Sequence, residues 1–541
     1  MIADVAAKEW DVIVIGAGMG GGTVGRRLAE KGLSVLFVES GPLGRRAEQQ
    51  RLRDDIEDPV ARRIRGFWPK PFNATIDGRT SQFFGPVGGG VGGSSAFYAG
   101  TLERPERHDI DDSAERPHPT GGWPERFDAF RPYFDDAEKL FHVCGDEDPL
   151  SREAPSGLLP PPVMVDGDKA MMESFRSAGL HPYRVHLGVK FLLDCQLCFG
   201  LKCPRPCKMD GRSAGVEPAL ETGNAALLDM CHVRALRGTR DRITHIEAER
   251  DGQALTLRAR RYVLAAGALN SPRVLLSSRS EDWPEGCANG SGTVGRNLMF
   301  HLNEMVAIWP ERGVSFDGPS KAISLRDFYY QGGRRYGTLA AMGIDASYGE
   351  ITWFLNTIFD RSALRKLRPL REFTRIPAYV AARMFGNAKI YSGIIEDLGY
   401  ADNRVLLDEA DPGRLRFEYT IRPELRQRRR EFRRLVKRRL GKQRSFFLTL
   451  QPELNLAHSC GTLRFGADPS KSVLDVSCRA HDVHNLYVAD SSFMPTSFGI
   501  NPGLMIAANA LRVADRVAAD IGHSAADELG GKPRVAAIHT A

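Results

Sequence analysis

The hydrophobic pattern of the first forty residues predicts a strand, a tight turn, a helix and a second strand. Residues 11–15 are Asp-Val-Ile-Val-Ile, and residues 34–38 form a second apolar run that ends at Glu39. Unbroken β-branched runs are typical of strands that are buried in a parallel sheet. Residues 23–31 have a helical pattern, so the segment is predicted to form a β-α-β unit.

A glycine-rich turn joins the first strand to the helix and matches G-x-G-x-x-G. Gly16 suits the tight turn, Gly18 lets a pyrophosphate approach the backbone, and Gly21 lets helix and strand pack closely. The start of the helix offers N–H groups and a positive dipole end to phosphate. Glu39 lies where an acid accepts hydrogen bonds from ribose hydroxyls and repels a 2′-phosphate. The pattern predicts a dinucleotide site without separating FAD from NAD, and its alternative is a structural glycine turn.

Later segments carry signals of the same kind. Residues 85–95 are a second glycine-rich run, whose bare backbone can pass close to a ligand. Residues 485–490 predict a strand that ends at Asp490. The sequence Gly499-Ile500-Asn501-Pro502-Gly503 then precedes a helical run at residues 504–519. Ligand-binding signals therefore lie near both ends of the chain.

Length and composition favour a globular protein of more than one lobe. The chain has 541 residues, of which 42% are hydrophobic and 26% charged. No apolar run reaches the roughly 18 residues that a membrane span needs. The first ten residues lack the apolar core of a signal peptide, so a cytoplasmic location is the default prediction. Export together with a partner subunit stays open.

The net charge of +7 is concentrated in residues 361–383 and 422–444. The second segment predicts a helix with a basic surface and one apolar stripe, formed by Leu425, Phe432, Leu435, Val436 and Leu440. The simplest interpretation is a surface helix with a solvated basic face. The alternative is peripheral contact with an anionic membrane or an acidic partner. Nucleic acid is not predicted, because neither segment has the interleaved aromatic residues of a stacking surface.

Four of the nine cysteines fall in one short loop. Cys195, Cys198, Cys203 and Cys207 are interrupted by Pro204, Pro206 and Gly200. Closely spaced thiolates hold iron–sulfur clusters or zinc, and zinc sites usually draw two pairs from separate knuckles. The single loop therefore favours an iron–sulfur cluster, with zinc and unligated thiols as alternatives.

Four segments together resemble the glucose–methanol–choline (GMC) oxidoreductase family. They are Gly90-Val91-Gly92-Gly93-Ser94-Ser95, residues 263–276, residues 294–301 and residues 458–515. The resemblance implies an α/β fold, with a doubly wound, Rossmann-like FAD-binding lobe and a substrate lobe with an antiparallel sheet. The FAD lobe would combine residues 8–115, 210–305 and 455–525, and the substrate lobe, with the cysteine loop, residues 116–209 and 306–454. Residues 526–541 are expected to form a loose tail.

The resemblance also implies catalytic residues and the state of the cofactor. His458 matches the family's histidine that faces the flavin and would act as base, and Asn501 would orient the substrate hydroxyl. A buried structural histidine and a helix cap are the alternative interpretations. Ala96-Phe97-Tyr98 stands where some members carry a histidine linked to flavin, so FAD is expected to be non-covalent. The expected cofactor-binding residues are Gly16, Gly18, Gly21, Glu39, Gly92, Gly93, Ser94, Val233, Gly267, Asp490, Asn501 and Pro502.

The implied activity is oxidation of an alcohol to a carbonyl, with the hydride passing to flavin N5. A sugar, a steroid or another cyclic or primary alcohol would be the small-molecule substrate. Some bacterial members hold a three-iron cluster in this part of the chain, which implies an external electron acceptor, either a protein or a small partner subunit. The alternatives are an alcohol oxidase that uses oxygen, and a lyase that contains flavin.

Overall fold

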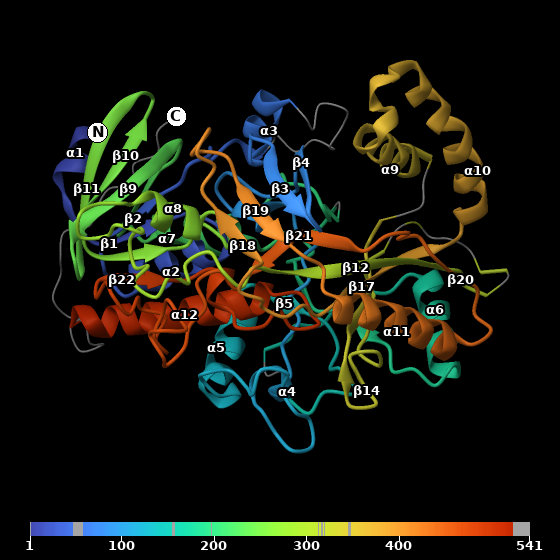
Figure 1. Ribbon diagram of the computed structural model, residues 1–541. Coiled ribbons are helices and arrows are strands. Elements are labelled where there is room, and N and C mark those ends of the chain that lie inside the picture. Colours follow the sequence, from blue (N-terminus) through green and yellow to red (C-terminus); the bar gives the residue numbers. More distant parts are fainter. Residues whose placement is uncertain are drawn as a thin grey trace.

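The computed structural model describes residues 2–46, 58–153, 157–195, 197–311, 313–314, 318, 320–344 and 348–522. The expected tail at residues 526–541 lies outside the described residues. Two large sheets organise the molecule, one at the left and one at the centre and right of Figure 1.

The predicted β-α-β unit lies in the middle of a parallel sheet. β1 (Glu9–Ile15) pairs in parallel with β2 (Val35–Val38) and with β11 (Gln253–Leu264), and all but the first and third residues of β1 are buried. β8 (Ala225–Leu228) and β22 (Leu486–Val488) extend the sheet at either edge, again in parallel. The apolar runs of β1 and β2 therefore form strands covered on both faces, as their composition predicts.

Helices and an antiparallel ribbon complete this lobe. α2 (Met19–Glu30) packs on α12 (Gly503–Ile521), which in turn contacts α5 (Phe127–Leu140). Gly25 of α2 lies directly on the ring of Phe37, where a Cβ atom would come within 2.2 Å of the ring. The first half of β11 pairs with β10 (Arg242–Arg250), which pairs with β9 (Cys231–Thr239). The α/β lobe with a parallel sheet agrees with the prediction, whereas its antiparallel edge of β9 and β10 was not predicted.

The second sheet is antiparallel. Its strands follow the order β20 (Ser445–Phe447), β12 (Met299–Ile308), β17 (Lys389–Ile395), β16 (Gly337–Ala341), β13 (Ile323–Leu325) and β6 (Tyr183–Arg184), and β21 (Glu453–Cys460) also pairs with β12. α11 (Pro423–Leu440) covers it, and Phe432 packs so closely on Gly393 that a Cβ there would meet the ring at 2.5 Å. The apolar stripe predicted for residues 422–444 is buried. Its basic surface is not simply solvated, since Arg429 is buried against Glu304.

The lobe boundaries stay a prediction, and those at residues 305 and 455 fall inside strands of the antiparallel sheet. β12 and β21 lie in the antiparallel sheet, although residues 299–305 and 455–460 were expected in the FAD lobe. The motif at residues 294–301 continues without a break into β12, so a boundary at residue 305 divides one strand. A smaller sheet also joins distant segments, in the order β18 (Arg404–Leu406), β19 (Arg416–Tyr419), β3 (Phe72–Ile76) and β4 (Arg79–Phe83).

A helical hairpin projects from the antiparallel sheet at the upper right of Figure 1. It consists of α9 (Tyr348–Arg361), the 3-10 helices η5 (Ala363–Lys366) and η6 (Arg368–Thr374), and α10 (Arg375–Phe385). At its base the ring of Phe385 stacks on Trp309, with ring centroids 5.5 Å apart. No helix in the described part of the chain is long and apolar enough to cross a membrane.

Shorter elements complete the fold. They are α1 (Ile2–Ala7), α3 (Pro59–Arg65), α4 (Arg107–Ile110), α6 (Asp166–Ser177), α7 (Glu217–Glu221), α8 (Ser271–Ser277), η3 (Gly93–Phe97), η4 (Gly211–Val216), η7 (Ser491–Phe493), β5 (Val143–Cys144), β7 (Leu187–Gly188), β14 (Tyr330–Gln331) and β15 (Arg334–Arg335).

Candidate active site

A cavity of about 700 Å³ lies between the carboxyl ends of the parallel strands and the antiparallel sheet. Ile15, Val38 and Ala265, at or just after the ends of β1, β2 and β11, line one part of it. Asn303 of β12 and Ile394 of β17 line another part. Ligands of open α/β sheets bind outside the carboxyl ends of the strands, so the fold places this cavity where a cofactor is expected.

The two glycine-rich runs meet at this cavity. A Cβ atom on Gly93 would lie 2.9 Å from the Cα of Gly18, and Gly93 has a φ of +54° that favours glycine. Gly16 has a φ of +100° and its backbone touches Ala265. Gly21 does not line the cavity, and a Cβ there would come within 1.9 Å of the carbonyl oxygen of Gly16. It allows helix and strand to pack closely, the role that the sequence predicts.

Most of the other predicted cofactor residues also line the cavity. Gly92 does not, and its φ of +98° instead shapes the turn that precedes η3. The predicted residues that reach the cavity are Gly16, Gly18, Glu39, Gly93, Ser94, Val233, Gly267, Asp490, Asn501 and Pro502. The structure thus brings together segments from the beginning, middle and end of the chain.

Two buried carboxylates shape this part of the cavity. Glu39 accepts hydrogen bonds from the N–H groups of Ala17, at 2.8 Å, and Gly41, at 3.0 Å, which hold it beside the glycine turn. Asp490 accepts from the N–H of Gly267 at 2.8 Å and from Ser271 and Ser492. Because both oxygens of Asp490 are engaged with protein donors, its contribution to cofactor binding is expected to be indirect, through the Gly267 turn.

His458 and Asn501 meet at the same cavity. The amide nitrogen of Asn501 lies 3.4 Å from Nε2 of His458. The pairing of β12 with β21 is irregular between Met299 and His301, whose partners on β21 are Cys460 and Asn455. Such a bulge re-aims side chains, and here His458 lies within the irregular segment. The predicted base and its predicted orienting partner are therefore adjacent.

His301 fixes the tautomer of His458. Its Nε2 lies 3.0 Å from the carbonyl oxygens of both Ser497 and Phe498, so this nitrogen carries a proton and donates it. Burial lowers the pKa of His301 to about 4, so the ring is neutral and its Nδ1 is an acceptor. The Nδ1 of His458 lies 3.0 Å away and must supply the proton of this contact. The Nε2 of His458 is then unprotonated on the side of Asn501.

A neighbouring amide completes this arrangement. The amide of Asn455 approaches the same Nδ1 of His458 to 3.1 Å. The oxygen and nitrogen of an amide exchange places when the group is turned over, and the hydrogen-bond network decides between the two orientations. With the proton on Nδ1, the orientation that fits places the oxygen of Asn455 toward His458. The amide of Asn303, 3.2 Å from that of Asn455, must then be turned over as well so that it donates to the same oxygen.

The environment keeps the His458 imidazole neutral. Burial lowers its pKa well below the usual value near 6.5, and positive charge on His301 and Lys321 would lower it further. Lys321 also lines the cavity, and its ammonium donates to the carbonyl oxygen of Ala341 at 3.0 Å. Burial lowers the pKa of Lys321 to about 8. Neither His301 nor Lys321 was predicted from the sequence, although His301 ends the motif at residues 294–301.

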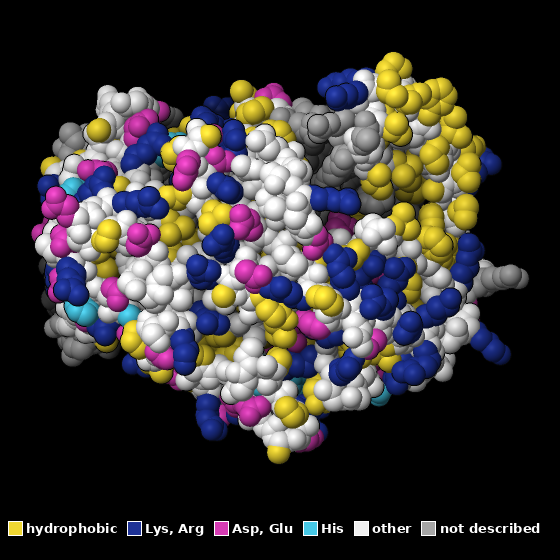
Figure 2. All heavy atoms as spheres, viewed as in Figure 1, with side chains coloured by type: hydrophobic (Ala, Val, Ile, Leu, Met, Phe, Trp, Pro, Cys, Tyr) yellow, Lys and Arg dark blue, Asp and Glu magenta, His cyan; other side chains and the backbone are white. Residues whose placement is uncertain are grey.

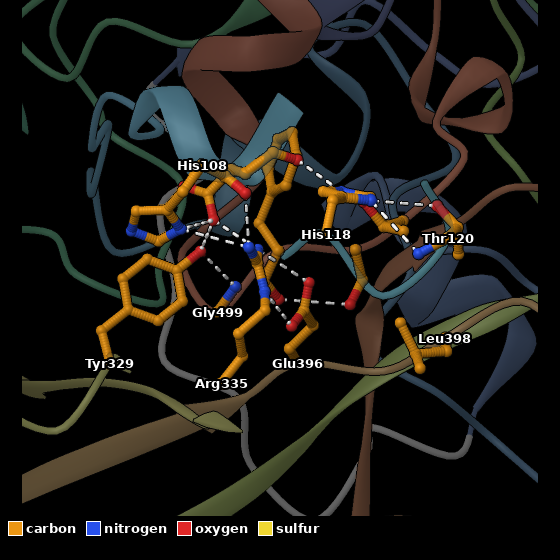
Figure 3. A network of polar contacts seen from close by, with 12 residues as sticks. His108, His118, Thr120, Tyr329, Arg335, Glu396, Leu398 and Gly499 are labelled. Atoms are coloured by element: carbon orange, nitrogen blue, oxygen red, sulfur yellow. Dashed lines mark hydrogen bonds and ion pairs between the residues drawn. The ribbon is translucent and has the colours of Figure 1, made fainter. Parts of the chain in front are cut away.

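A buried polar network holds the loop that precedes Asn501 (Figure 3). The N–H of Gly499 donates to the hydroxyl of Tyr329 at 2.9 Å, and that hydroxyl donates to Asp109. Arg335 bridges Asp109 at 2.5 Å and Glu396 at 2.8 Å. Both carboxylates and the arginine are buried, so the network is an internal support for the loop rather than a surface ion pair.

The cysteine loop gathers its sulfur atoms without forming a recognisable metal site. Sγ of Cys203 lies 3.2 Å from Sγ of Cys207, whereas two thiolates on one zinc ion are about 3.8 Å apart. A hydrogen bond with Cys198 lowers the pKa of the Cys203 thiol. Among the described residues no group of three or more His, Cys, Asp or Glu side chains is placed to hold a metal ion. The predicted iron–sulfur or zinc ligation by Cys195, Cys198, Cys203 and Cys207 is therefore not supported.

The cavity has the donor set that a dinucleotide needs. The N-cap of α2 is Gly18, which provides no side-chain cap, so the first N–H groups of the helix face the site and can bind a pyrophosphate. Glu39 offers a carboxylate for ribose hydroxyls. The close approach of Gly18 and Gly93 leaves a surface of bare backbone. These features fit a dinucleotide that extends from the glycine turn toward His458.

Sequence comparisons decide the family. The profile of the N-terminal region of GMC oxidoreductases matches residues 10–303, and that of the C-terminal region matches residues 399–510. The chain is a GMC oxidoreductase. This GMC oxidoreductase is therefore an FAD-dependent enzyme that acts on alcohols, in a family that contains oxidases and dehydrogenases. The resemblance noted from the sequence is confirmed.

Individual relatives match over nearly the whole chain. Paromamine 6′-oxidase of Streptomyces fradiae is 29% identical, covering 95% of this chain and 92% of its own. The fructose dehydrogenase large subunit of Gluconobacter japonicus is 24% identical, covering 94% of this chain and 98% of its own. The crystal structure of pyridoxine 4-oxidase from Mesorbium loti has a TM-score of 0.59 at 20% identity, covering 94% of this GMC oxidoreductase and 99% of that chain.

Proposed function

We propose that the protein oxidises a primary or cyclic alcohol to a carbonyl compound, with His458 as the base and Asn501 as the orienting residue. The observation that carries this proposal is the 3.0 Å contact between His301 and His458, which leaves Nε2 of His458 ready to accept a proton. Bound FAD supplies the hydride acceptor for the carbinol carbon. Gly16, Gly18, Glu39, Gly93 and Gly267 would hold the cofactor, with Ser94, Val233, Asp490 and Pro502 around it.

The protein's own part in the reaction is the handling of the hydroxyl proton. A hydroxyl group between the two side chains would accept a hydrogen bond from the amide of Asn501 and donate one to Nε2 of His458. The proton then moves to Nε2, while Nδ1 keeps its proton against His301. Since burial disfavours the resulting imidazolium, the proton would leave readily at the end of the cycle.

The lining of the cavity favours a hydroxylated substrate. Asn303, Ser392 and Asn455 offer polar groups near His458, and Lys321 adds an ammonium donor. Paromamine 6′-oxidase and fructose dehydrogenase are named for substrates of the sugar class, which agrees with such a lining. We infer that sugar-like alcohols are the first compounds to test, ahead of steroids.

The proposed electron acceptor is an external carrier rather than oxygen, which would make the protein a dehydrogenase. With the cysteine cluster not supported, this proposal rests on the similarity to relatives such as the fructose dehydrogenase large subunit. The similarity to paromamine 6′-oxidase favours oxygen as the second candidate. Reduced enzyme prepared anaerobically should be reoxidised quickly by a dye or quinone and slowly by air. Fast reoxidation in air with stoichiometric hydrogen peroxide would instead make the protein an oxidase.

The flavin is proposed to be non-covalent. Ala96, Phe97 and Tyr98 stand where a linking histidine would be needed, and Phe97 stacks on Phe67 with ring centroids 3.8 Å apart. Acid precipitation should release all yellow colour into the supernatant. Flavin retained on the denatured pellet would show a covalent link.

A further inference from the structure

The hairpin carries a continuous stripe of exposed apolar side chains. Four of these side chains follow the spacing of one helical face, namely Phe373, Ile376, Val380 and Met384. Each of them is between 52% and 63% exposed. In α10 the buried residue is Ala378, which lies on the opposite face. Apart from Phe385 at its end, the helix therefore turns its larger apolar side chains outward, the reverse of the arrangement in an ordinary surface helix.

The same apolar surface continues onto the neighbouring turns. Leu364, Leu367 and Leu370 of the η5–η6 region are exposed, as is Tyr379 of α10. Figure 2 shows these elements as a yellow band at the upper right of the molecule. Monomeric soluble proteins seldom expose a contiguous apolar patch of this kind unless it binds something.

Basic side chains border the apolar band. Lys366, Arg368, Arg371, Arg375 and Arg383 lie on the hairpin, where the acidic residue of η6, Glu372, pairs with Arg375 at 2.9 Å. Below the band, Figure 2 shows a dense group of Lys and Arg side chains over α11. The combination of an apolar band and a basic border is complementary to an anionic lipid bilayer, which offers a hydrocarbon layer beneath acidic headgroups.

We propose that the hairpin from α9 to α10 docks this enzyme on an anionic membrane surface, with the apolar stripe of α10 entering the interface. The basic helix α11 supplies attraction but not insertion, because Leu425, Phe432 and Val436 of its own apolar stripe are buried against the sheet. α10 has 11 residues, so it lies in the interface and does not span the bilayer.

The docking surface lies next to the alcohol end of the active site. Phe385, at the end of α10, packs in one apolar cluster with Trp309 and Met342. Met342 also lines the cavity that contains His458. The bilayer would therefore lie close to the cavity wall that Met342 forms, whatever alcohol the enzyme oxidises.

Flotation of the FAD-loaded protein with vesicles tests this proposal. Vesicles of phosphatidylcholine with about one third phosphatidylglycerol would be compared with vesicles of phosphatidylcholine alone. The variant Ile376→Asp/Met384→Asp should lower the partition coefficient on the anionic vesicles by about a hundredfold, since each of the two apolar side chains is worth about tenfold when buried. The variant Arg375→Gln/Arg383→Gln should lower the partition coefficient on anionic vesicles and should make that coefficient less dependent on salt.

A matched control and three contrary results complete the test. Leu159→Asp/Val163→Asp places the same charges on exposed apolar positions outside the hairpin and should bind as the wild type does. All variants should retain FAD and the oxidation rate of a soluble alcohol, so that failure of the proposed activity and failure of docking are told apart. Wild-type protein that does not float, or an α10 variant that floats equally well, would overturn the proposal. An α10 variant that only dissociates a dimer would assign the hairpin to a second copy instead.

Discussion

The Nδ1 atoms of His301 and His458 lie 3.0 Å apart, although the two residues are 157 positions apart in the chain. Because His301 donates from Nε2 to two carbonyl groups, the shared proton belongs to His458. In the proposed mechanism His301 would act through the tautomer of its neighbour, as a positioning residue. Variants of the site can distinguish this role of His301 from that of a residue that only packs.

Replacement of His301 tests the tautomer directly. His301→Phe keeps the ring but removes the acceptor, so His458 can place its proton on Nε2 and lose its ability to act as base. The rate of anaerobic flavin reduction by an alcohol should fall by about tenfold or more. His301→Asn offers an amide oxygen to the Nδ1 proton and should restore part of the rate. If the phenylalanine variant is reduced as fast as the wild type, His301 is only a packing residue.

The pH dependence of flavin reduction should reflect the depressed pKa of His458. The base is active when neutral, and burial places its pKa well below 6.5. The rate should therefore stay constant from about pH 8 down to pH 6.5 and fall only when the pH drops further. Stopped-flow reduction across this range is the measurement. An acidic limb centred at or above pH 6.5 would contradict the assignment.

Lys321 should influence the pH at which flavin reduction slows on the acidic side. After burial and His301, its positive charge is the remaining cause that lowers the pKa of His458. Lys321→Met removes the charge, so the acidic limb should move to higher pH, whereas Lys321→Arg should leave it nearly in place. An unchanged profile in the methionine variant would mean that the ammonium does not act on His458.

The buried network around Arg335 should support both the fold and the active-site loop. Arg335→Met leaves Asp109 and Glu396 buried without their partner and should cost about 3–5 kcal/mol of unfolding free energy. Arg334→Met removes the neighbouring exposed arginine and should change stability little, since surface pairs contribute little. Thermal unfolding of the two variants is the comparison. Equal melting temperatures would show that the network is not needed for stability.

The close approach of the glycine runs should be essential for FAD binding. The Cβ position of Gly18 points into the gap before Gly93, 3.7 Å from its Cα. Gly18→Val would fill the space that a pyrophosphate needs and should reduce the flavin content of the purified protein by about tenfold. Gly349→Ala, at a position with open space around its Cβ, should bind flavin normally. Full flavin occupancy in the valine variant would place the pyrophosphate elsewhere.

Local signals allowed the sequence to predict the nucleotide-binding part well. The apolar runs of β1 and β2, the glycine turn and the helix after Pro502 depend on near neighbours, and each is present. The first helix, α2, begins at Met19 inside the glycine run, four residues before the predicted start. The contact of His301 with His458 depends on the irregular pairing of β12 with β21, which no short segment encodes. The exposure of the apolar stripe of α10 could likewise not be predicted, because periodicity identifies an apolar face but not whether another element covers it.

The most direct test of the proposed chemistry is the anaerobic reductive half-reaction of His458→Ala beside the wild type. A screen of sugar-like alcohols would first identify one that bleaches the flavin band of the wild-type protein. The variant should keep its FAD and be reduced by that alcohol about a hundredfold more slowly, or slower still. Reduction at a near-normal rate in the variant would show that another group removes the proton and would contradict the mechanism.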